Sequence, residues 1–282
     1  MNTPPPFEYT WFCAGAVLVG LAALLAWRRS LVAVGGPAGL AARLAPRPAL
    51  LVDLALAALA TGIALRWLRL GHGPFLNMFE ILASSLVSLG LAWRIAHWRL
   101  PAVRESAPVA LGLLAVMAAW LLTVDPVDTH RPATYEMGIM WFHILLGKIF
   151  LGCALVATAL AGVILARAGA WGRTRFQRMP ADATLDALAW RLMLAALVFE
   201  SLMLVAGAVW AQDAWGRFWA WDPLETWAFV TWLALSAAVH ARLAWRLGPR
   251  AGALMIVAVF VLAFLTFFGV PFVTLAPHKG AV

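Results

Sequence analysis

Charged residues are scarce in this sequence: only 12% of its 282 residues are Asp, Glu, Lys or Arg, while 64% are hydrophobic. A soluble globular domain carries about 25% charged residues, so the composition excludes an ordinary soluble protein. Cysteine is scarce as well, because Cys13 and Cys153 are the only two and no CxxC pair occurs. The sequence therefore does not favour a dithiol relay within the chain. Each cysteine is predicted to be a small apolar packing residue.

Long apolar runs are abundant instead. A run of roughly 18 residues crosses about 30 Å of hydrocarbon as a helix. Eight candidates lie near 9–27, 49–67, 75–94, 107–124, 138–166, 189–211, 224–246 and 251–272. The predicted fold class is all-α: a polytopic membrane protein with about eight transmembrane helices, forming a single membrane domain over residues 1–282. The first residues, MNTPPPFEYTWF, have no basic region and contain Glu8, so the first helix is expected to stay in place.

The basic residues predict the orientation, because Lys and Arg are retained in cytoplasmic loops. With the N-terminus outside, the loops at 28–48, 95–106, 167–188 and 247–250 are cytoplasmic and, with their flanking helix ends, hold fifteen arginines. The opposite side holds four arginines and Lys279. Both termini are therefore predicted to be extracytoplasmic, and the net charge of +8 reflects topology. No basic, aromatic-interleaved soluble element is present, so no nucleic-acid partner is expected.

Five ionisable residues inside predicted spans are candidates for a function or for pairing between helices, because charge is costly there. They are Asp53, Glu80, Lys148, Glu200 and His240. Lys148 is predicted to form a buried ion pair with Glu80 or Glu200, and Asp53 lies close enough to a span end to reach the interface. His240 lies about 17 residues, or roughly 25 Å, along the seventh span, in the inner half of the membrane. It is either a packing residue or an axial ligand, since imidazole is a common ligand of haem iron.

Two further histidines fall near the outer leaflet. His143, in MGIMWFHILLGKIF, lies about a turn and a half into the fifth span, with Gly147 one turn further on the same face. His278 follows the last span. Together they suggest a two-imidazole iron site, for which His130 and His72 are alternative outer ligands.

The segment 212–227, between the sixth and seventh spans, is predicted to be extracytoplasmic and contains WGRFWAWDPLETW. Its DPLE portion is typical of a helix start, with Asp222 as N-cap, Pro223 at the first helical position and Glu225 at the third. The positive end of the helix dipole stabilises both carboxylates at this position.

Tryptophan is concentrated around this segment: six of the sixteen lie in the 23 residues 210–232. An interfacial belt needs fewer, so the excess favours a stacking surface for a flat, mostly apolar ligand over a simple membrane anchor. Arg217 is suited to pair with a carboxylate of that ligand. The predicted platform consists of Trp215, Trp219, Trp221 and Trp227.

The stretch WGRFWAWDPLETW resembles the WWD signature of the haem-handling proteins of cytochrome c maturation. The following ETWAFVTWLALSAAVHARL is similar to the CcsA-type component of the System II cytochrome c synthase, which is also named CcsB or ResC in bacteria. HGPFLNMFEIL is similar to the segment that opens the third span of that family. The resemblance covers roughly residues 70–280.

The resemblance implies a role for each candidate residue. His143 and His278 match the external ligands of haem iron and His240 matches a transmembrane ligand, while the four platform tryptophans, Arg217 and Asp222 belong to the external haem site. The implied activity is a holocytochrome-c synthase of the inner membrane, active on its extracytoplasmic face. It takes haem b and an apocytochrome c with a CxxCH motif, and it works with a ResB/CcsB-type membrane partner. The alternatives are a System I-like haem delivery protein without synthase activity and, in a different class, a non-haem transporter or scaffold.

Overall fold

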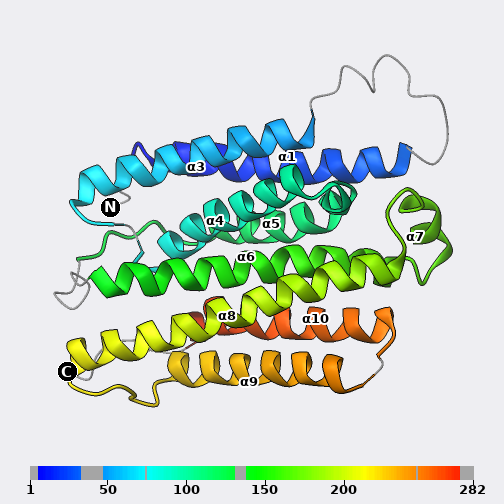
Figure 1. Cartoon of the computed structure of the whole chain (residues 1–282). Helices are drawn as coiled ribbons and strands as arrows, with labels where there is room; N and C mark the ends of the chain where they lie inside the picture. Colours follow the sequence, from blue (N-terminus) through cyan, green and yellow to red (C-terminus); the bar gives the residue numbers. More distant parts are fainter. Residues whose placement is uncertain (1–5, 33–46, 74, 131–137, 246, 274–282) are drawn as a thin grey trace. The chain divides into compact units, whose positions relative to one another are not determined.

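The computed structural model describes residues 6–32, 47–73, 75–130, 138–245 and 247–273 (Figure 1). Within these ranges the structure is helical and has no strand. Eight of the described helices are long and apolar enough to cross a membrane: Tyr9–Ser30, Pro48–Leu70, Met78–Arg99, Pro101–Leu121, Gly138–Ala166, Asp182–Trp215, Pro223–Ala244 and Pro249–Gly269. The predicted all-α, eight-span membrane fold is thereby confirmed, while the side on which each terminus lies stays a prediction.

The chain divides into two compact units, residues 1–129 with 166–180 and residues 130–165 with 181–282. We call them unit 1 and unit 2 and describe each by itself. The single domain over residues 1–282 stays a prediction.

The described residues of unit 1 form α1 (Tyr9–Val32), α3 (Pro48–Leu70), α4 (Met78–Arg99), the 3-10 turn η1 (Pro101–Ser106), α5 (Ala107–Leu121) and α7 (Ala170–Arg175). Helix α1 packs against α3 and α5, and α4 packs against the same two helices (Figure 1). A Cβ on Gly15 of α1 would lie 2.5 Å from Leu59 Cγ of α3. Small residues at this contact therefore let the two backbones approach closely, as is common in membrane helix pairs.

A buried charged cluster ties α3, α4 and the loop after α5 together. Arg66 of α3 is 1% exposed and pairs with Glu80 of α4, with an Nη2–Oε1 distance of 2.9 Å. Its guanidinium also donates to the Val127 carbonyl at 2.7 Å and lies 3.4 Å from an Asp128 oxygen. Arg69 adds a bidentate pair with Asp128 at 2.5 and 2.7 Å. Because the fork of each guanidinium is satisfied by several oxygens, the loop is fixed to the helix ends.

Glu80 has a second function, at the start of α4. The Asn77 side chain caps this helix by accepting from the Glu80 N–H at 2.9 Å, and the Glu80 carboxylate reaches back to the Leu76 N–H at 2.8 Å. One carboxylate therefore closes a helix N-terminus and neutralises Arg66. The predicted pairing of Glu80 with Lys148 is corrected: the ion-pair partner of Glu80 is Arg66.

Asp128 gives the cluster a defined dependence on pH. Its hydrogen bonds from Arg69 hold the pKa of the carboxyl below its ordinary value of 3.8. A depressed pKa contributes stability that is complete above 3.8 and is lost as pH falls through the lower, folded-state value. We expect Asp128→Asn to lower the free energy of unfolding at pH 7 by no more than about 1 kcal/mol, because the side chain is half exposed. Thermal unfolding in detergent should show this difference from wild type shrinking as pH falls below 3.8 and vanishing once the wild-type carboxyl is protonated in the folded protein; a difference that acidification leaves unchanged would contradict the assignment.

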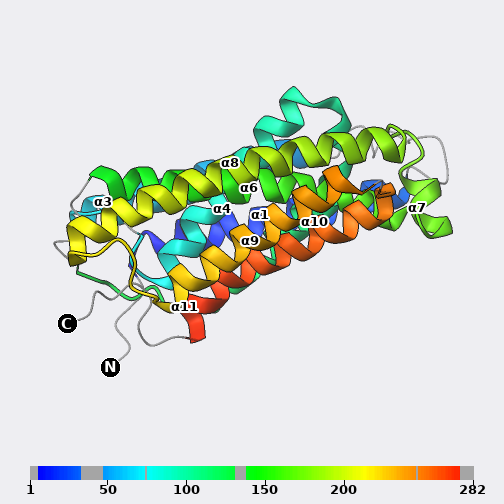
Figure 2. The same cartoon turned by 60° about the horizontal axis from the view of Figure 1, so that its bottom comes forward.

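Unit 2 contains most of α6 (Gly138–Ala166), then α8 (Asp182–Trp215), α9 (Pro223–Ala244), α10 (Pro249–Phe264), the π-helical turn η3 (Leu265–Gly269) and α11 (Val270–Val273). Helices α8, α9 and α10 pack against one another, as both views show (Figures 1 and 2). Asp186 of α8 pairs with Arg242 of α9 at 2.5 Å, which links the two helices near the Asp182 end of α8. Gly252 of α10 lies against Asp186 and Trp190, because a Cβ there would come within 3 Å of both side chains.

The remaining intramembrane residues are placed as follows. Asp53 is half exposed and pairs with Arg94 at 2.6 Å, consistent with a position near the interface. Glu200 is fully buried in α8, and within the described structure neither of its carboxyl oxygens has a hydrogen-bond partner. The alternative pairing of Lys148 with Glu200 through a hydrogen bond is therefore not observed.

Candidate functional site

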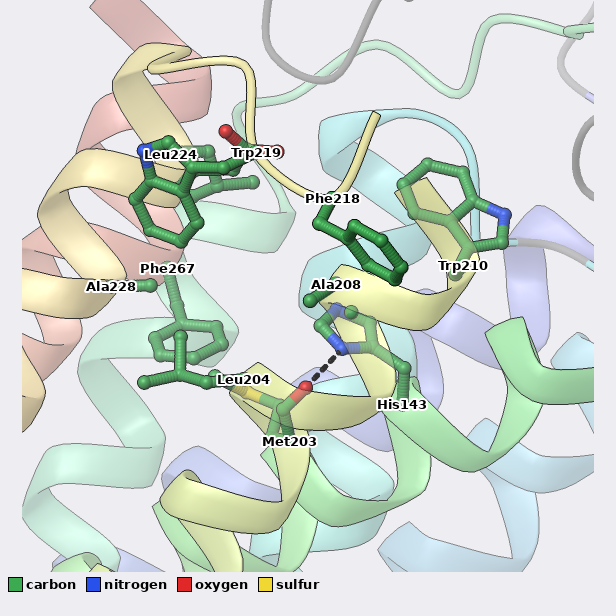
Figure 3. A pocket seen from close by; sticks show the side chains of 12 residues that line it. His143, Met203, Leu204, Ala208, Trp210, Phe218, Trp219, Leu224, Ala228 and Phe267 are labelled. Atoms are coloured by element: carbon green, nitrogen blue, oxygen red, sulfur yellow. Dashed lines mark hydrogen bonds between the residues drawn. The ribbon is translucent and has the colours of Figure 1, made fainter. Parts of the chain in front are cut away.

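His143 is anchored to a neighbouring helix through one ring nitrogen. Helix α6 begins at Gly138, so His143 lies about a turn and a half along it, as predicted. Its Nδ1 lies 2.8 Å from the main-chain carbonyl of Met203 on α8 (Figure 3). Since a carbonyl only accepts, Nδ1 carries the proton and Nε2 carries the lone pair. This is the tautomer and the backbone contact that orient metal-ligating histidines.

Gly207 makes this approach possible. A Cβ at this position of α8 would lie 2.9 Å from both Cε1 and Nδ1 of His143. Such contacts are shorter than van der Waals distances, so any side chain there would displace the imidazole. Gly147 has a different neighbour, because its Cβ would meet Met203 Sδ at 3.0 Å.

A small cavity of about 60 Å³ opens beside His143. Figure 3 shows it surrounded by the rings of Phe218, Trp219 and Phe267, with Met203 and Leu204 of α8 below them. Ala228 and Leu224 contribute from α9. A volume of this size holds only a few water molecules. The cavity is therefore a recess beneath the tryptophan-rich segment that cannot enclose a large ligand as it stands.

The π-helical turn after α10 forms one wall of the recess. Thr266, fully buried within this turn, exchanges a hydrogen bond with Thr231 of α9 at 2.8 Å and donates to the Trp227 carbonyl at 3.4 Å. The next residue, Phe267, lines the cavity. Single π-helical turns are frequent at functional sites because the extra residue redirects a side chain. Here the turn places Phe267 opposite His143.

The tryptophan-rich segment is held by its two ends. Helix α8 ends at Gly216, whose φ of 71° is left-handed and whose N–H donates to the Gln212 carbonyl. At the other end the Asp222 side chain accepts from the Glu225 N–H at 2.9 Å, with Pro223 at the first position of α9. The Glu225 carboxylate accepts from the Ala220 N–H at 2.8 Å. The predicted helix start is confirmed at all three residues.

Trp221, immediately before this cap, has a φ of 58°. A non-glycine residue in the left-handed region costs about 1–3 kcal/mol and persists only where its surroundings impose it. Such strain is common at binding sites.

The four tryptophans of the predicted platform do not form a single stacking surface. Of its four tryptophans, only Trp219 lines the same cavity as His143, and its indole N–H is buried without a partner in the described structure. Trp215 packs edge-on against Trp210 at 4.8 Å. Trp221 and Trp227 are 73% and 46% exposed, and Arg217 is also exposed.

Sequence reasoning missed several residues of the recess. The largest are Trp210, Phe218 and Phe267, which come from a helix end, the connecting segment and the π-helical turn. In the sequence their only signal is proximity to other aromatics, which an apolar span shares. Gly207 was detectable as a lone glycine in a long apolar helix, a type of residue that often marks close helix contact.

Comparison with known proteins identifies the family. The family model for "Cytochrome C assembly protein" matches residues 74–278. The chain belongs to the cytochrome c assembly protein family.

Individual relatives agree with this membership. The chain is 29% identical to "Cytochrome c biogenesis protein CcsA" of Parasynechococcus marenigrum (strain WH8102), with 82% of this chain and 85% of the relative covered. It is 28% identical to CcsA of Synechococcus sp. (strain CC9605), with 99% and 98% covered. The resemblance to the CcsA-type component is confirmed, and this cytochrome c assembly protein has a role in cytochrome c maturation.

A solved structure shares the fold. Cytochrome c Heme Lyase CcmF superposes with a TM-score of 0.66 at 20% identity, over 95% of this chain and 47% of CcmF. The chain thus spans about half the length of that protein.

Among the described residues of this cytochrome c assembly protein, no other candidate histidine lines the recess. His240 lies on α9 near its C-terminal end and is exposed. His72 is buried in unit 1, where its ring nitrogens lie 2.9 Å from the Thr129 carbonyl and 3.2 Å from that of Gly73. His130 is exposed. His278 lies outside the described residues, and no cluster of three or more metal-ligating side chains occurs within them.

Proposed function

We propose that this cytochrome c assembly protein receives haem b in the inner membrane and presents it on the extracytoplasmic face, where the vinyl groups are joined to an apocytochrome c CxxCH motif. The iron is held between His143 and His278, and Trp215, Trp219, Trp221, Trp227 and Arg217 hold the ring and a propionate. The activity is that of a holocytochrome-c synthase working in a complex.

The observation that carries this proposal is the orientation of His143. Its Nδ1–H is committed to the Met203 carbonyl, so the lone pair is on Nε2. The ring lines a recess with Phe218 and Trp219 of the tryptophan-rich segment. An oriented imidazole beside large aromatic rings suits an iron porphyrin, which needs an axial nitrogen and an apolar flat surface.

The size of the recess sets a condition on binding. About 60 Å³ is too small for a macrocycle, so haem reaches His143 only if Phe218 and Trp219 move apart. Both belong to the segment between Gly216 and Asp222, which is held at its two ends. The rings of Trp221 and Trp227 and the exposed Arg217 then supply a surface and a cation outside the recess.

The reaction depends more on positioning the thiols and the vinyl groups than on reactive side chains of this protein. Each CxxCH thiol adds across a vinyl double bond, so that sulfur bonds to one vinyl carbon and hydrogen ends on the other, with no net oxidation. The CxxCH histidine replaces one protein ligand, His278, and the ring is held while the thiols approach. Holding reacting groups at attack distance accelerates such a step without a covalent intermediate on the protein.

His240 extends the proposal to an inner site. It lies in the inner half of the predicted seventh span and is exposed on α9, where a ResB/CcsB-type partner can supply a second imidazole. We expect His240→Ala to remove haem from the inner site of the purified complex while the outer site keeps part of its haem, measured by haem content and absorption spectra. Equal loss from both sites would contradict separate inner and outer sites.

The activity is tested by expressing the chain with a ResB-type partner and a CxxCH substrate in cells that lack cytochrome c maturation. Covalent haem on the substrate, detected by in-gel haem staining after denaturation, is the expected result. Haem that co-purifies with the chain without any covalent product would favour the System I-like delivery function. A purified complex with no haem absorption would favour the non-haem transporter or scaffold.

A matched pair of glycine variants tests the role of the His143 orientation. We expect Gly207→Ala to lower holocytochrome yield by about 10–100-fold, the usual cost of disturbing the partner that orients a ligand. Gly147→Ala should be tolerated, because its new methyl would come closest to the flexible Met203 thioether, at 3.0 Å, and would meet Phe267 only at an ordinary contact distance of 3.6 Å. Comparable yields from the two variants, at comparable membrane levels, would exclude the proposed orientation effect.

A further inference from the structure

A second, larger cavity lies in unit 1, at the helix ends opposite those that carry the Arg66 cluster. It has a volume of about 260 Å³ and forms where the C-terminal ends of α1 and α4, the N-terminal ends of α3 and α5, and helix α7 converge. Among the described residues, its lining includes Arg29, Arg47, Arg104, Arg175 and His97, and no carboxylate. Four arginines around one cavity create a strongly positive potential.

Two hydrogen-bond donors of this cavity are buried and unused. Trp93 is fully buried and its indole N–H has no partner in the described structure. Arg175 has a side chain only 9% exposed, and its Nε–H is also buried without a partner. Buried donors are paired in the great majority of cases, so each unpaired one requires an explanation. Both residues line the same basic cavity, so an acceptor bound there would lie beside two donors that lack a partner.

The existing carboxylates do not provide this acceptor. Glu105 approaches Arg175 only through Nη1, at 3.7 Å, and it is 40% exposed. Asp53 is occupied by both donors of Arg94, at 2.6 and 3.0 Å. Burial lowers the pKa of Arg175, in the direction expected for a cation removed from water without full compensation.

The surroundings of the cavity match the membrane interface. Trp27 of α1 and Trp171 of α7 pack against each other with ring centroids 5.3 Å apart, and both are nearly half exposed. Exposed tryptophans at helix ends mark the headgroup level of a bilayer. An adjoining hollow is lined by Leu50 and Trp98, each more than half exposed, which suits an acyl chain or glycerol backbone.

From these observations we infer that the cavity is a binding site for the phosphate of an anionic phospholipid headgroup, with Trp93 Nε1 and Arg175 Nε donating to the phosphate oxygens and Arg29, Arg47 and Arg104 supplying charge. Basic pockets between transmembrane helices on the cytoplasmic side commonly bind such headgroups. The distribution of basic residues in the sequence assigns this end of unit 1 to the cytoplasm. The site does not depend on the proposed haem function.

Native mass spectrometry of the purified full-length chain tests the inference, with phosphatidylglycerol and phosphatidylcholine titrated separately. We expect wild type to retain one phosphatidylglycerol at concentrations where it retains no phosphatidylcholine. Arg175→Gln and Trp93→Phe should each weaken phosphatidylglycerol binding about tenfold, which corresponds to roughly 1.4 kcal/mol. Arg178→Gln is the matched control. Arg178 is exposed near α7 and does not line the cavity, and its replacement by Gln removes the same charge.

Each alternative outcome is distinguishable. Equal weakening by Arg178→Gln would mean a diffuse basic surface and overturn the site. Binding of inorganic phosphate without retention of phosphatidylglycerol would assign the cavity to a free anion and overturn the lipid assignment. Trp93→Phe keeps the inference testable if the arginine variant misfolds, since it removes one N–H and no charge. Unchanged lipid affinity in a variant that unfolds at the wild-type temperature would refute the role of the donor that it lacks.

Discussion

Replacing His143 by glycine is expected to abolish covalent haem attachment, with a fall in holocytochrome yield of at least about 100-fold. Disturbing a partner of a metal ligand alone costs about 10–100-fold, and this change removes the ligand itself. The void left by the ring opens into the recess beside Met203 and Phe267, which can admit free imidazole. Added imidazole should therefore restore part of the yield and the low-spin absorption of a bis-nitrogen-ligated haem.

The matched control is His130→Gly. His130 is exposed, precedes α6 in the chain and does not line the recess. Its loss should leave the yield near that of wild type, and imidazole should change nothing. If His130→Gly gave the larger loss, or if the His143→Gly protein retained full haem, His130 would replace His143 as the outer ligand.

The largest effect on stability is expected from Arg66→Met. Arg66 and Glu80 are each 1% exposed and 2.9 Å apart, so removing the guanidinium leaves a buried carboxylate without its cation. Breaking a buried pair on one side costs about 3–5 kcal/mol. The main-chain carbonyl of Val127 would lose one of its two donors in the same step and keep the Asn77 amide. We expect the thermal unfolding midpoint in detergent to fall by roughly 10 °C.

A double variant separates the ion pair from simple loss of packing. Adding Glu80→Gln to Arg66→Met removes the stranded charge while keeping an acceptor for the Leu76 N–H, which the carboxylate binds at 2.8 Å. Part of the lost stability should return. A double variant less stable than Arg66→Met would indicate that the contribution of Arg66 is packing and its carbonyl bonds, with little from Glu80. Arg99→Met, at an exposed cation–π contact with Trp98, serves as the neutral control.

Features that depend on neighbouring residues were predicted better than features that depend on contacts between distant residues. The DPLE start of α9 is encoded within four residues, because an N-cap and its partner amide are three positions apart, and the structure has that bond. The fifth span begins and ends where the apolar run does. The ion-pair prediction for Glu80 failed for the opposite reason: many arginines and two lysines were available along the chain, and only the packing of α3 against α4 brings Arg66 to it.

The platform illustrates the same limit. Tryptophan density predicted a binding surface, but the density does not encode which indole faces inward. Gly216 and Asp222 fix the segment so that Trp219 enters the recess and Trp221 remains exposed. The direction of each ring depends on backbone angles such as the φ of 58° at Trp221. The residue type does not predict such an angle.

The sequence by itself determined that the chain is an eight-span helical membrane protein of the cytochrome c assembly family, because hydrophobic length and a contiguous motif act along the chain and need no partner in space. Only the tertiary structure decided that His143 is oriented by the Met203 carbonyl across from Gly207, that Phe267 enters the same recess through a π-helical turn, and that two unpaired donors share a basic cavity in unit 1. These features are contacts between helices, and helix packing is set by the shapes of residues far apart in the sequence.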